Sequence, residues 1–322
     1  MIINQMSKMH GAGAYEDGQF RIVAQNGGYV HFSTDFGETW IEQTSMGLNA
    51  WNRIGMNKTA EVICIGDNGQ KLWRSTDYGA TWLSDGFNSS SWLNIAVSND
   101  TGKYIMAGNN TSTYELLLSS NFGTSFVVKA ADVNNRIYGV GVSETGQYMV
   151  ASGNTVTHRS TNYGIGAWSY LGYEAWFTMD LCMSASGQYV TRAARVNGGD
   201  GIHWPMVSND YGASYTTITS LDEAEWYYCD MSLSGEYQMV AQDYNGDGKL
   251  YLSDDYGVTW AATTATYTNI NGVHCSGTGK YMCIMHGTTQ YLSDDYGATW
   301  AESPYGITGT PFLASQGMNK LL

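Results

Sequence analysis

Short apolar runs recur along the whole chain, and each run ends at a turn residue. Leu93–Ser98 is one such run, and Tyr104-Ile105-Met106-Ala107 is the next, with Asn99, Asp100 and Gly102 between them. The apolar positions do not follow the spacing of three to four residues that an amphipathic helix requires. The pattern therefore predicts a chain of short β-strands with few helices.

One polar stretch repeats between these runs. Ser253–Trp260 reads Ser-Asp-Asp-Tyr-Gly-Val-Thr-Trp, and Ser293–Trp300 is nearly identical. We call such a stretch a box, and the chain has seven, at 33–40, 75–82, 119–126, 160–168, 208–215, 253–260 and 293–300. Their third residues are Asp35, Asp77, Asn121, Asn162, Asp210, Asp255 and Asp295, which lie 40 to 48 residues apart. This period is typical of a four-stranded propeller blade.

A second motif, Gly-x-Tyr followed by an apolar run, alternates with the boxes, as at Gly102–Gly108 and Gly146–Ala151. Each unit then divides into four strands, A to D. A Ser-x-x-Gly turn joins A to B, a Gly- and Asn-rich loop joins B to C, and the box joins C to D. The predicted fold class is all-β: a single seven-bladed β-propeller with four antiparallel strands per blade.

The residues of the box are those that a tight hairpin needs. A short carboxylate or amide at the third position accepts backbone N–H groups inside the turn. The Gly two positions later allows a positive φ, and the final aromatic residue packs between neighbouring sheets. We therefore interpret the boxes as structural and expect no catalytic role for their acids.

The repeated Ser-x-Asp-x-Gly-x-Thr-Trp resembles the Asp-box, or BNR, repeat of β-propellers. That family includes sialidases, xyloglucanases, sortilin-type receptors, a photosystem assembly factor and many phage virion proteins. The resemblance covers about residues 6–303. It implies a propeller fold, but it does not define an activity, because unrelated functions share the repeat.

The domain organisation follows from the repeats. Residues 1–306 form the propeller, and residues 307–322 form either a closing strand or a tail. Strand A of the first blade is supplied either by Met9–Tyr15 or, from the other end of the chain, by Phe312–Met318. In the second case the two ends of the chain pair and close the ring.

Net charge and cysteine content limit the possible binding partners and the compartment in which the protein is made. The net charge of −14, with only 15 Lys and Arg residues, disfavours nucleic acid and anionic membrane surfaces. The five cysteines are an odd number and lie in predicted strands, which favours buried free thiols made in a reducing compartment. We expect no secretory leader, because Met1–Gly11 has no apolar core long enough for one, and no membrane insertion, because no stretch approaches the length of a transmembrane span. We expect a virion protein made in the host cytoplasm, or alternatively an extracellular or cell-surface protein.

Candidate catalytic groups are few. A sialidase would need an arginine triad, and Phe20-Arg21-Ile22 resembles part of its first motif, but the register places Arg21 on strand B, away from the central channel. A glycoside hydrolase needs two carboxyl groups at the correct separation. Asp180 and Asp230 lie on predicted inner strands, and these acids could form an acidic mouth together with the acids that precede them, Glu174, Asp222, Glu223 and Glu225. Solvated loop acids are the alternative interpretation. We predict no catalytic residues.

Binding is expected on the face that carries the variable D–A and B–C loops. Four tryptophans lie at or near the start of strand A: Trp51, Trp92, Trp176 and Trp226. Their rings could stack on sugars, or they could fill the space between blades. Asp243, Asn245 and Asp247 have the spacing of a calcium loop without its closing Glu, so a plain hairpin is the alternative. No other cofactor is expected.

The leading functional interpretation is a non-catalytic binding or structural propeller, in a phage or viral virion and associated with its tail. Its expected partners are a glycan or cell-surface receptor, other virion proteins, or both. A glycoside hydrolase of the sialidase or xyloglucanase-like type is the first alternative. A bacterial cell-surface adhesion module is the second.

Overall fold

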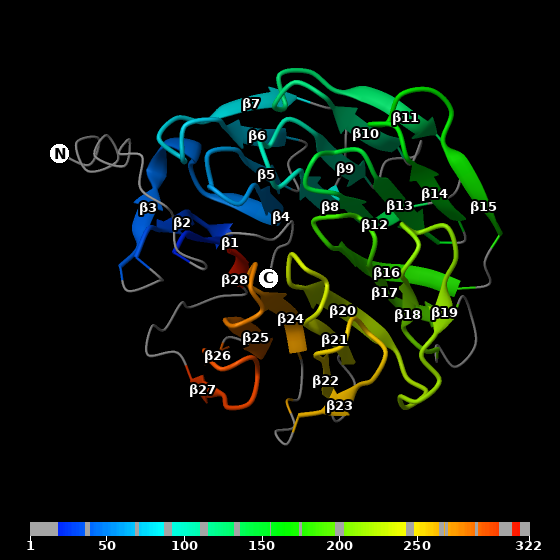
Figure 1. Ribbon diagram of the computed structural model, residues 1–322. Coiled ribbons are helices and arrows are strands. Elements are labelled where there is room, and N and C mark those ends of the chain that lie inside the picture. Colours follow the sequence, from blue (N-terminus) through cyan, green and yellow to red (C-terminus); the bar gives the residue numbers. More distant parts are fainter. Residues whose placement is uncertain are drawn as a thin grey trace.

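The computed structural model describes residues 19–35, 39–67, 71–86, 92–109, 115–131, 136–154, 156–173, 176–196, 203–242, 248–263, 267, 270–286, 289–302 and 311–315. These residues form seven four-stranded antiparallel blades arranged in a ring (Figure 1). Within them, helix is limited to a single 3-10 turn at Thr44–Met46. The predicted seven-bladed β-propeller is confirmed.

Each blade runs from strand A at the ring axis to strand D at the rim (Figure 1). From blade 1 to blade 7, strand A is β28 (Pro311–Ser315), β4 (Asn49–Met56), β8 (Trp92–Val97), β12 (Ile137–Val142), β16 (Trp176–Met183), β20 (Trp226–Met231) and β24 (Ile270–Cys275). Strand B is β1 (Arg21–Gly28), β5 (Ile63–Asp67), β9 (Ile105–Asn109), β13 (Met149–Gly153), β17 (Val190–Val196), β21 (Gln238–Gln242) and β25 (Met282–His286). Strand C is β2 (Val30–Ser33), β6 (Lys71–Ser75), β10 (Glu115–Ser119), β14 (Val156–Ser160), β18 (Met206–Ser208), β22 (Leu250–Ser253) and β26 (Thr289–Ser293). Strand D is β3 (Ile41–Gln43), β7 (Leu83–Gly86), β11 (Val127–Ala131), β15 (Ser169–Tyr173), β19 (Thr216–Thr217), β23 (Ala261–Ala262) and β27 (Ala301–Glu302).

The C-terminal segment supplies strand A of blade 1. β28 pairs antiparallel with β1, with Val23 opposite Leu313. Blade 1 is therefore built from both ends of the chain, which closes the ring. Met9–Tyr15, the other segment considered for this strand, lies outside the described residues.

The boxes form the C–D hairpins as the sequence predicts. In blade 2, Asp77 accepts hydrogen bonds from the Thr81 backbone N–H at 2.9 Å and from the Ser75 hydroxyl at 2.8 Å. Gly79 has φ of 77°, and the Trp82 indole donates to the Gly79 carbonyl at 3.0 Å. The side chain at the third position thus holds the turn together, which explains its repetition.

The A–B turns are joined to one another around the axis by backbone hydrogen bonds. Glu144 N–H donates to the Ala185 carbonyl at 2.7 Å, Ala185 to Leu233 at 2.8 Å, and Leu233 to Gly277 at 2.8 Å. These bonds link blades 4 to 7 in succession on the face that carries the boxes. We call this the box face, and the face with the D–A and B–C loops the loop face.

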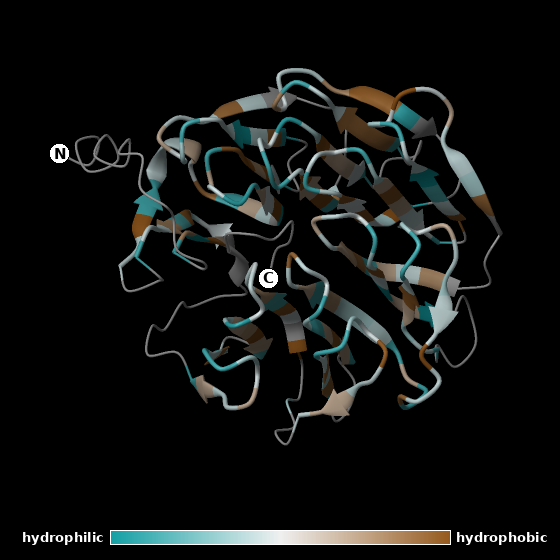
Figure 2. Ribbon diagram, in the orientation of Figure 1, coloured by the Kyte–Doolittle hydropathy of each residue, from teal (hydrophilic) through white to brown (hydrophobic). Residues whose placement is uncertain are grey.

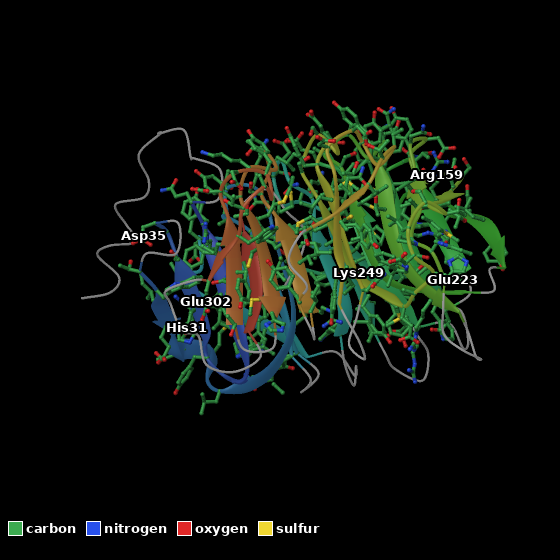
Figure 3. All side chains as sticks on the ribbon, turned by 90° about the horizontal axis from the view of Figure 1, so that it is seen from below. His31, Asp35, Arg159, Glu223, Lys249 and Glu302 are labelled. Atoms are coloured by element: carbon green, nitrogen blue, oxygen red, sulfur yellow. The ribbon has the colours of Figure 1, made fainter. Side chains whose placement is uncertain are left out.

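Apolar side chains fill the layers between neighbouring blades. Figure 2 shows hydrophobic residues concentrated on the strands and hydrophilic residues in the connecting turns. In the layer between blades 1 and 2, Ile54 and Ile63 are 1% and 0% exposed. All five cysteines are buried and free, as predicted. In the side view of Figure 3, Asp35 and Arg159 lie toward the box face, and His31 and Glu223 lie toward the loop face. None of the helical structure in the described residues is long and apolar enough to span a membrane.

Candidate functional site at the ring axis

Three of the four tryptophans expected to bind a ligand are buried between blades. Trp51, Trp92 and Trp226 are 1%, 0% and 0% exposed. The indole of Trp51 donates to the Gly28 carbonyl at 2.9 Å, and that of Trp92 to the Lys71 carbonyl at 3.0 Å. A buried ring presents no face to a sugar. The expectation that these residues stack on a ligand is therefore corrected: they hold neighbouring blades together.

The register separates the fourth tryptophan from the other three. Trp51, Trp92 and Trp226 each directly precede the irregularity in their strand A, and Thr178 takes that place in blade 5. Trp176 lies two residues before Thr178, so it is not equivalent to them, and its side chain is outside those described.

Immediately after this irregularity, side chains from several blades form a polar layer around the axis. The amide of Asn94 donates to the Tyr138 carbonyl at 3.0 Å and to the Asp180 carboxylate at 3.3 Å. Arg53 and Tyr228 occupy the same register position in blades 2 and 6. Burial lowers the pKa of the Arg53 guanidinium, while the negative charge of Asp180 opposes that shift. This layer brings a cation, an amide and a carboxylate together.

The Asp180 carboxylate is engaged by backbone as well. One oxygen accepts the N–H of Leu181 at 3.0 Å, and the other accepts the N–H of Cys229 in the next blade at 3.1 Å. Among the described residues, β16 has no strand partner on its axial edge, so N–H groups there need other acceptors. Asp180 supplies them and ties blade 5 to blade 6.

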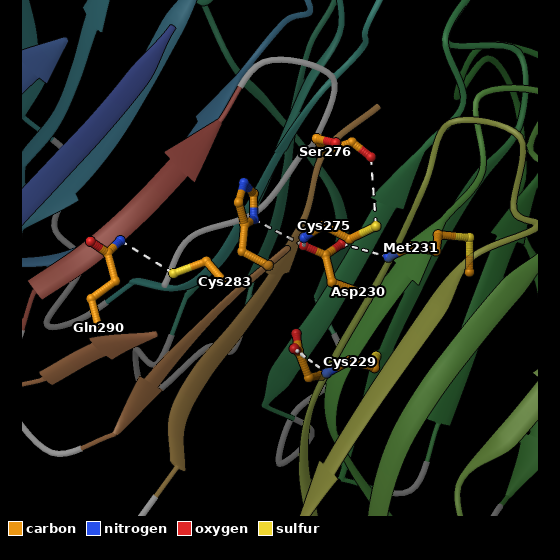
Figure 4. Close-up of polar contacts among 9 residues, drawn as sticks. Cys229, Asp230, Met231, Cys275, Ser276, Cys283 and Gln290 are labelled. Atoms are coloured by element: carbon orange, nitrogen blue, oxygen red, sulfur yellow. Dashed lines mark hydrogen bonds and ion pairs between the residues drawn. The ribbon is translucent and has the colours of Figure 1, made fainter. Parts of the chain in front are cut away.

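Asp230 has the same role one junction further on. Its carboxylate accepts the N–H of Met231 at 2.8 Å, the N–H of Cys275 at 3.4 Å, and a hydrogen bond from Nδ1 of His274 at 3.0 Å (Figure 4). Asp180 and Asp230 are 8% and 2% exposed. Both acids are thus bound within the wall of the ring. Neither acid is a solvated loop residue, whereas Asp222 and Glu223, which precede strand A of blade 6, are exposed.

A different cluster lies where strands A begin and strands B end, on the loop face. The Arg195 guanidinium lies 5.7 Å from the ring centroids of both Phe177 and Tyr227. It donates to the Tyr227 hydroxyl at 3.1 Å, and that hydroxyl donates to Glu225 at 2.9 Å. These four side chains are partly exposed. We call them the Arg195 cluster.

A second arginine–tyrosine pair lies in blade 4, where the arginine comes just before strand A instead of from strand B of the preceding blade. Arg136 donates to the Tyr138 hydroxyl at 3.2 Å, and Tyr138, like Tyr227, lies at the irregularity of its strand A. An extra residue at such a point redirects its side chain out of the regular pleat. The loop face therefore carries rings, guanidinium groups and a carboxylate close to the axis.

The box acids lie on the opposite face and are held by their own hairpins. Burial alone would raise the pKa of Asp77, but hydrogen bonds from Thr81 and Ser75 outweigh it and the pKa lies below its ordinary value. The pKa values of Asp35, Asp210 and Asp255 are lowered in the same way.

No metal centre is found in the part of the chain that the structure describes. No group of three or more His, Cys, Asp or Glu side chains there could hold a metal ion. The calcium candidates Asp243, Asn245 and Asp247 lie outside the described residues.

Comparison with known proteins identifies the fold and no more. The GH74 xyloglucanase of Xanthomonas campestris matches over 95% of this chain with a TM-score of 0.71 and 11% identity, and an ancestral GH74 enzyme matches over 95% with 0.69 and 15%. The chain spans 57% and 48% of the lengths of these two structures. YCF48 bound to a D1 peptide matches over 87% of this chain and 88% of its own, with a TM-score of 0.56 and 13% identity. No protein-family model and no curated protein matches the sequence.

The Arg195 cluster was not predicted from the sequence. Arg195 and Tyr227 are 32 residues apart and in different blades. Only the ring brings strand B of blade 5 next to strand A of blade 6. The recurrence of a Tyr at the strand A irregularity, in Tyr138 and Tyr227, is the one sequence signal that could have identified the site.

Proposed function

We propose that this chain is a non-catalytic binding propeller that recognises a carbohydrate through the Arg195 cluster on its loop face. The observation that carries the proposal is the partly exposed arrangement of Phe177, Tyr227, Arg195 and Glu225. Aromatic rings provide apolar faces for sugar rings, and the guanidinium and carboxylate groups orient hydroxyls by hydrogen bonds. Arg195 is already positioned between two rings, so little side-chain entropy is lost on binding.

A glycoside hydrolase is the competing function, and the fold similarity to GH74 enzymes is its support. Hydrolysis needs two carboxyl groups that reach the glycosidic bond and a water molecule. The acids nearest the axis, Asp180 and Asp230, are buried and accept backbone N–H groups on each side. This engagement favours binding without turnover.

The setting we propose is a virion, with the chain as a tail-associated, receptor-binding component of the Asp-box repeat family. The acidic surface, the free thiols and the repeated boxes support this assignment. A propeller with two faces suits it, since one face can bind a receptor glycan while the other docks to a neighbouring protein. The role requires no cofactor. Mass spectrometry of purified virus particles and of the particle-free lysate tests this setting. We expect to detect the chain in the particles and not in the particle-free fraction.

The binding function is tested with an array of neutral and acidic glycans. We expect retention of at least one glycan class by the wild-type chain and its loss in Arg195→Ala and Tyr227→Ala. Arg159→Ala is the matched control, because Arg159 lies on strand C near the box face and donates to the Tyr211 carbonyl at 2.7 Å. Equal loss in all three variants, or retention in Tyr227→Ala, would contradict the proposed site.

A further inference from the structure

Pairs of tyrosines bridge adjacent blades on the box face. Tyr189 of blade 5 packs against Tyr256 of the next box, with ring centroids 4.9 Å apart, and Tyr237 of blade 6 packs against Tyr296 at 4.7 Å. Tyr256 and Tyr296 remain 41% and 44% exposed. We call these four residues the tyrosine arc.

The backbone of the arc does not favour side chains of this size. Tyr256 and Tyr296 have φ of 63° and 62°, in the left-handed region where Gly or Asn is preferred. The boxes of blades 2 to 5 also have an aromatic residue with positive φ at this position, namely Tyr78, Phe122, Tyr163 and Tyr211, so the ring is a feature of the box in general. Much of the surface of Tyr256 and Tyr296 faces solvent.

The residue before each strand B tyrosine differs between blades, and the difference decides what covers the ring. In blade 3, Lys103 lies over the Tyr104 ring at 5.3 Å, and in blade 7, Lys280 lies over Tyr281 at 5.0 Å. Blades 4, 5 and 6 have Gln147, Gln188 and Glu236 at this position, so the acid there belongs to blade 6. Among the described residues, no lysine or arginine lies over Tyr189 or Tyr237.

Negative charge surrounds the same rings. Only the boxes of blades 6 and 7 have an acid at their second position, Asp254 and Asp294, and both are exposed. Burial raises the pKa of the Tyr237 hydroxyl, and the charges of Glu236 and Asp254 raise it further. Exposed aromatic rings with adjacent carboxylates form a surface that attracts cations.

We propose that the tyrosine arc is a docking site for a lysine- or arginine-bearing segment of a protein partner. The cations of that segment lie over Tyr189 and Tyr237, as Lys103 and Lys280 do over their own neighbours, and pair with Glu236, Asp254 and Asp294. The site lies on the box face, opposite the Arg195 cluster, so it does not depend on the proposed glycan binding.

The test measures the affinity of a fluorescein-labelled octalysine peptide by fluorescence anisotropy. Glu236→Lys places a cation of the chain itself beside Tyr237, so we expect the affinity to fall at least tenfold. Glu61→Lys is the matched control. It makes the same change of charge at the same turn position in blade 2, where Val62 follows in place of a tyrosine. We expect less than a twofold loss there.

The outcomes separate specific docking from general attraction to an acidic protein. Equal losses in Glu236→Lys and Glu61→Lys, or no loss in either, would overturn the proposal. So would binding of a neutral oligosaccharide that is lost in Tyr256→Leu when octalysine affinity is unchanged. Unchanged glycan retention in Glu236→Lys is expected, so failure of either site is recognised without reference to the other.

Discussion

Nδ1 of His274 lies 3.0 Å from the Asp230 carboxylate, inside the wall between blades 6 and 7. Their side chains are 3% and 2% exposed, so this contact is removed from solvent. Asp230 also bonds two backbone N–H groups on the axial strand edges. The pair therefore links strand A of blade 6 to strand A of blade 7.

Removing this tie should destabilise the ring strongly. We expect Asp230→Ala to lower the free energy of unfolding by about 3–5 kcal/mol, because it leaves buried donors unsatisfied. Asp222→Ala, which removes an exposed ion pair to Lys249 of 2.6 Å, should cost less than about 1 kcal/mol. Urea unfolding of both variants measures the difference, and similar losses would contradict the tie.

The A–B turn of blade 2 contains a correctable strain. Ala60 has φ of 56°, at the place where five other blades have Gly102, Gly146, Gly187, Gly235 and Gly279. We expect Ala60→Gly to raise stability by about 0.5–1 kcal/mol, since relief of the left-handed strain exceeds the added chain entropy. Ala80→Gly, at an exposed turn position without positive φ, should be neutral or destabilising. Thermal unfolding compares the two, and a loss in Ala60→Gly would refute the strain.

The boxes predict part of the response to acid. The folded pKa of Asp77 is depressed, so its stabilising contribution is present above its unfolded pKa and is lost as the pH falls through the folded pKa. Asp77→Asn imitates the natural box of blade 3, where Asn121 accepts the Ser125 N–H at 3.0 Å. We expect this variant to be less stable than wild type at pH 7, by about 1 kcal/mol or less because the hairpin is partly exposed, and equally stable near pH 2. Chemical unfolding at both pH values checks this, and a difference that persists at pH 2 would count against it.

Replacing a buried tryptophan should lower the stability of the ring more than it lowers glycan binding. Trp92→Ala is expected to lower the free energy of unfolding by about 3–5 kcal/mol, as for a buried large side chain in a closed core. Tyr227→Ala, at the partly exposed Arg195 cluster, should have a smaller effect on stability and a larger one on glycan retention. Differential scanning calorimetry beside the glycan array separates them. A Trp92→Ala variant that melts like wild type but loses binding would restore the ligand-stacking interpretation.

The sequence predicts the box hairpins well because their contacts are local in the chain. Box residues interact within a few positions of one another, as in the contact of Asp255 with the Thr259 N–H at 2.8 Å, so their spacing is sufficient to define the hairpin. Contacts between blades are different. Arg192 of blade 5 is 1% exposed, donates to Thr157 at 2.7 Å and lies 3.7 Å from the Tyr215 ring, although an arginine in a strand is usually exposed.

The contacts of the candidate site, like other contacts between blades, cannot be predicted from the sequence alone. Asp180 and Asp230 lie on inner strands, as the sequence predicts, but their hydrogen bonds depend on backbone N–H groups of the following blade, such as that of Cys229. Burial of Trp92 depends on the position of the neighbouring β6 backbone, where Lys71 accepts its indole N–H. Such relations arise from the register between separate sheets, and a single sequence without that register does not contain them.

The most direct test measures retention and release on the same glycan. A glycan that binds the wild-type chain on the array is incubated with the wild-type chain, with Arg195→Ala and with Asp180→Asn. The amounts of bound protein and of released sugar are then measured. We expect the wild-type chain to bind the glycan without releasing sugar, and Arg195→Ala to lose binding. Release of sugar by the wild-type chain, abolished in a folded Asp180→Asn variant, would contradict this expectation and identify the chain as a hydrolase.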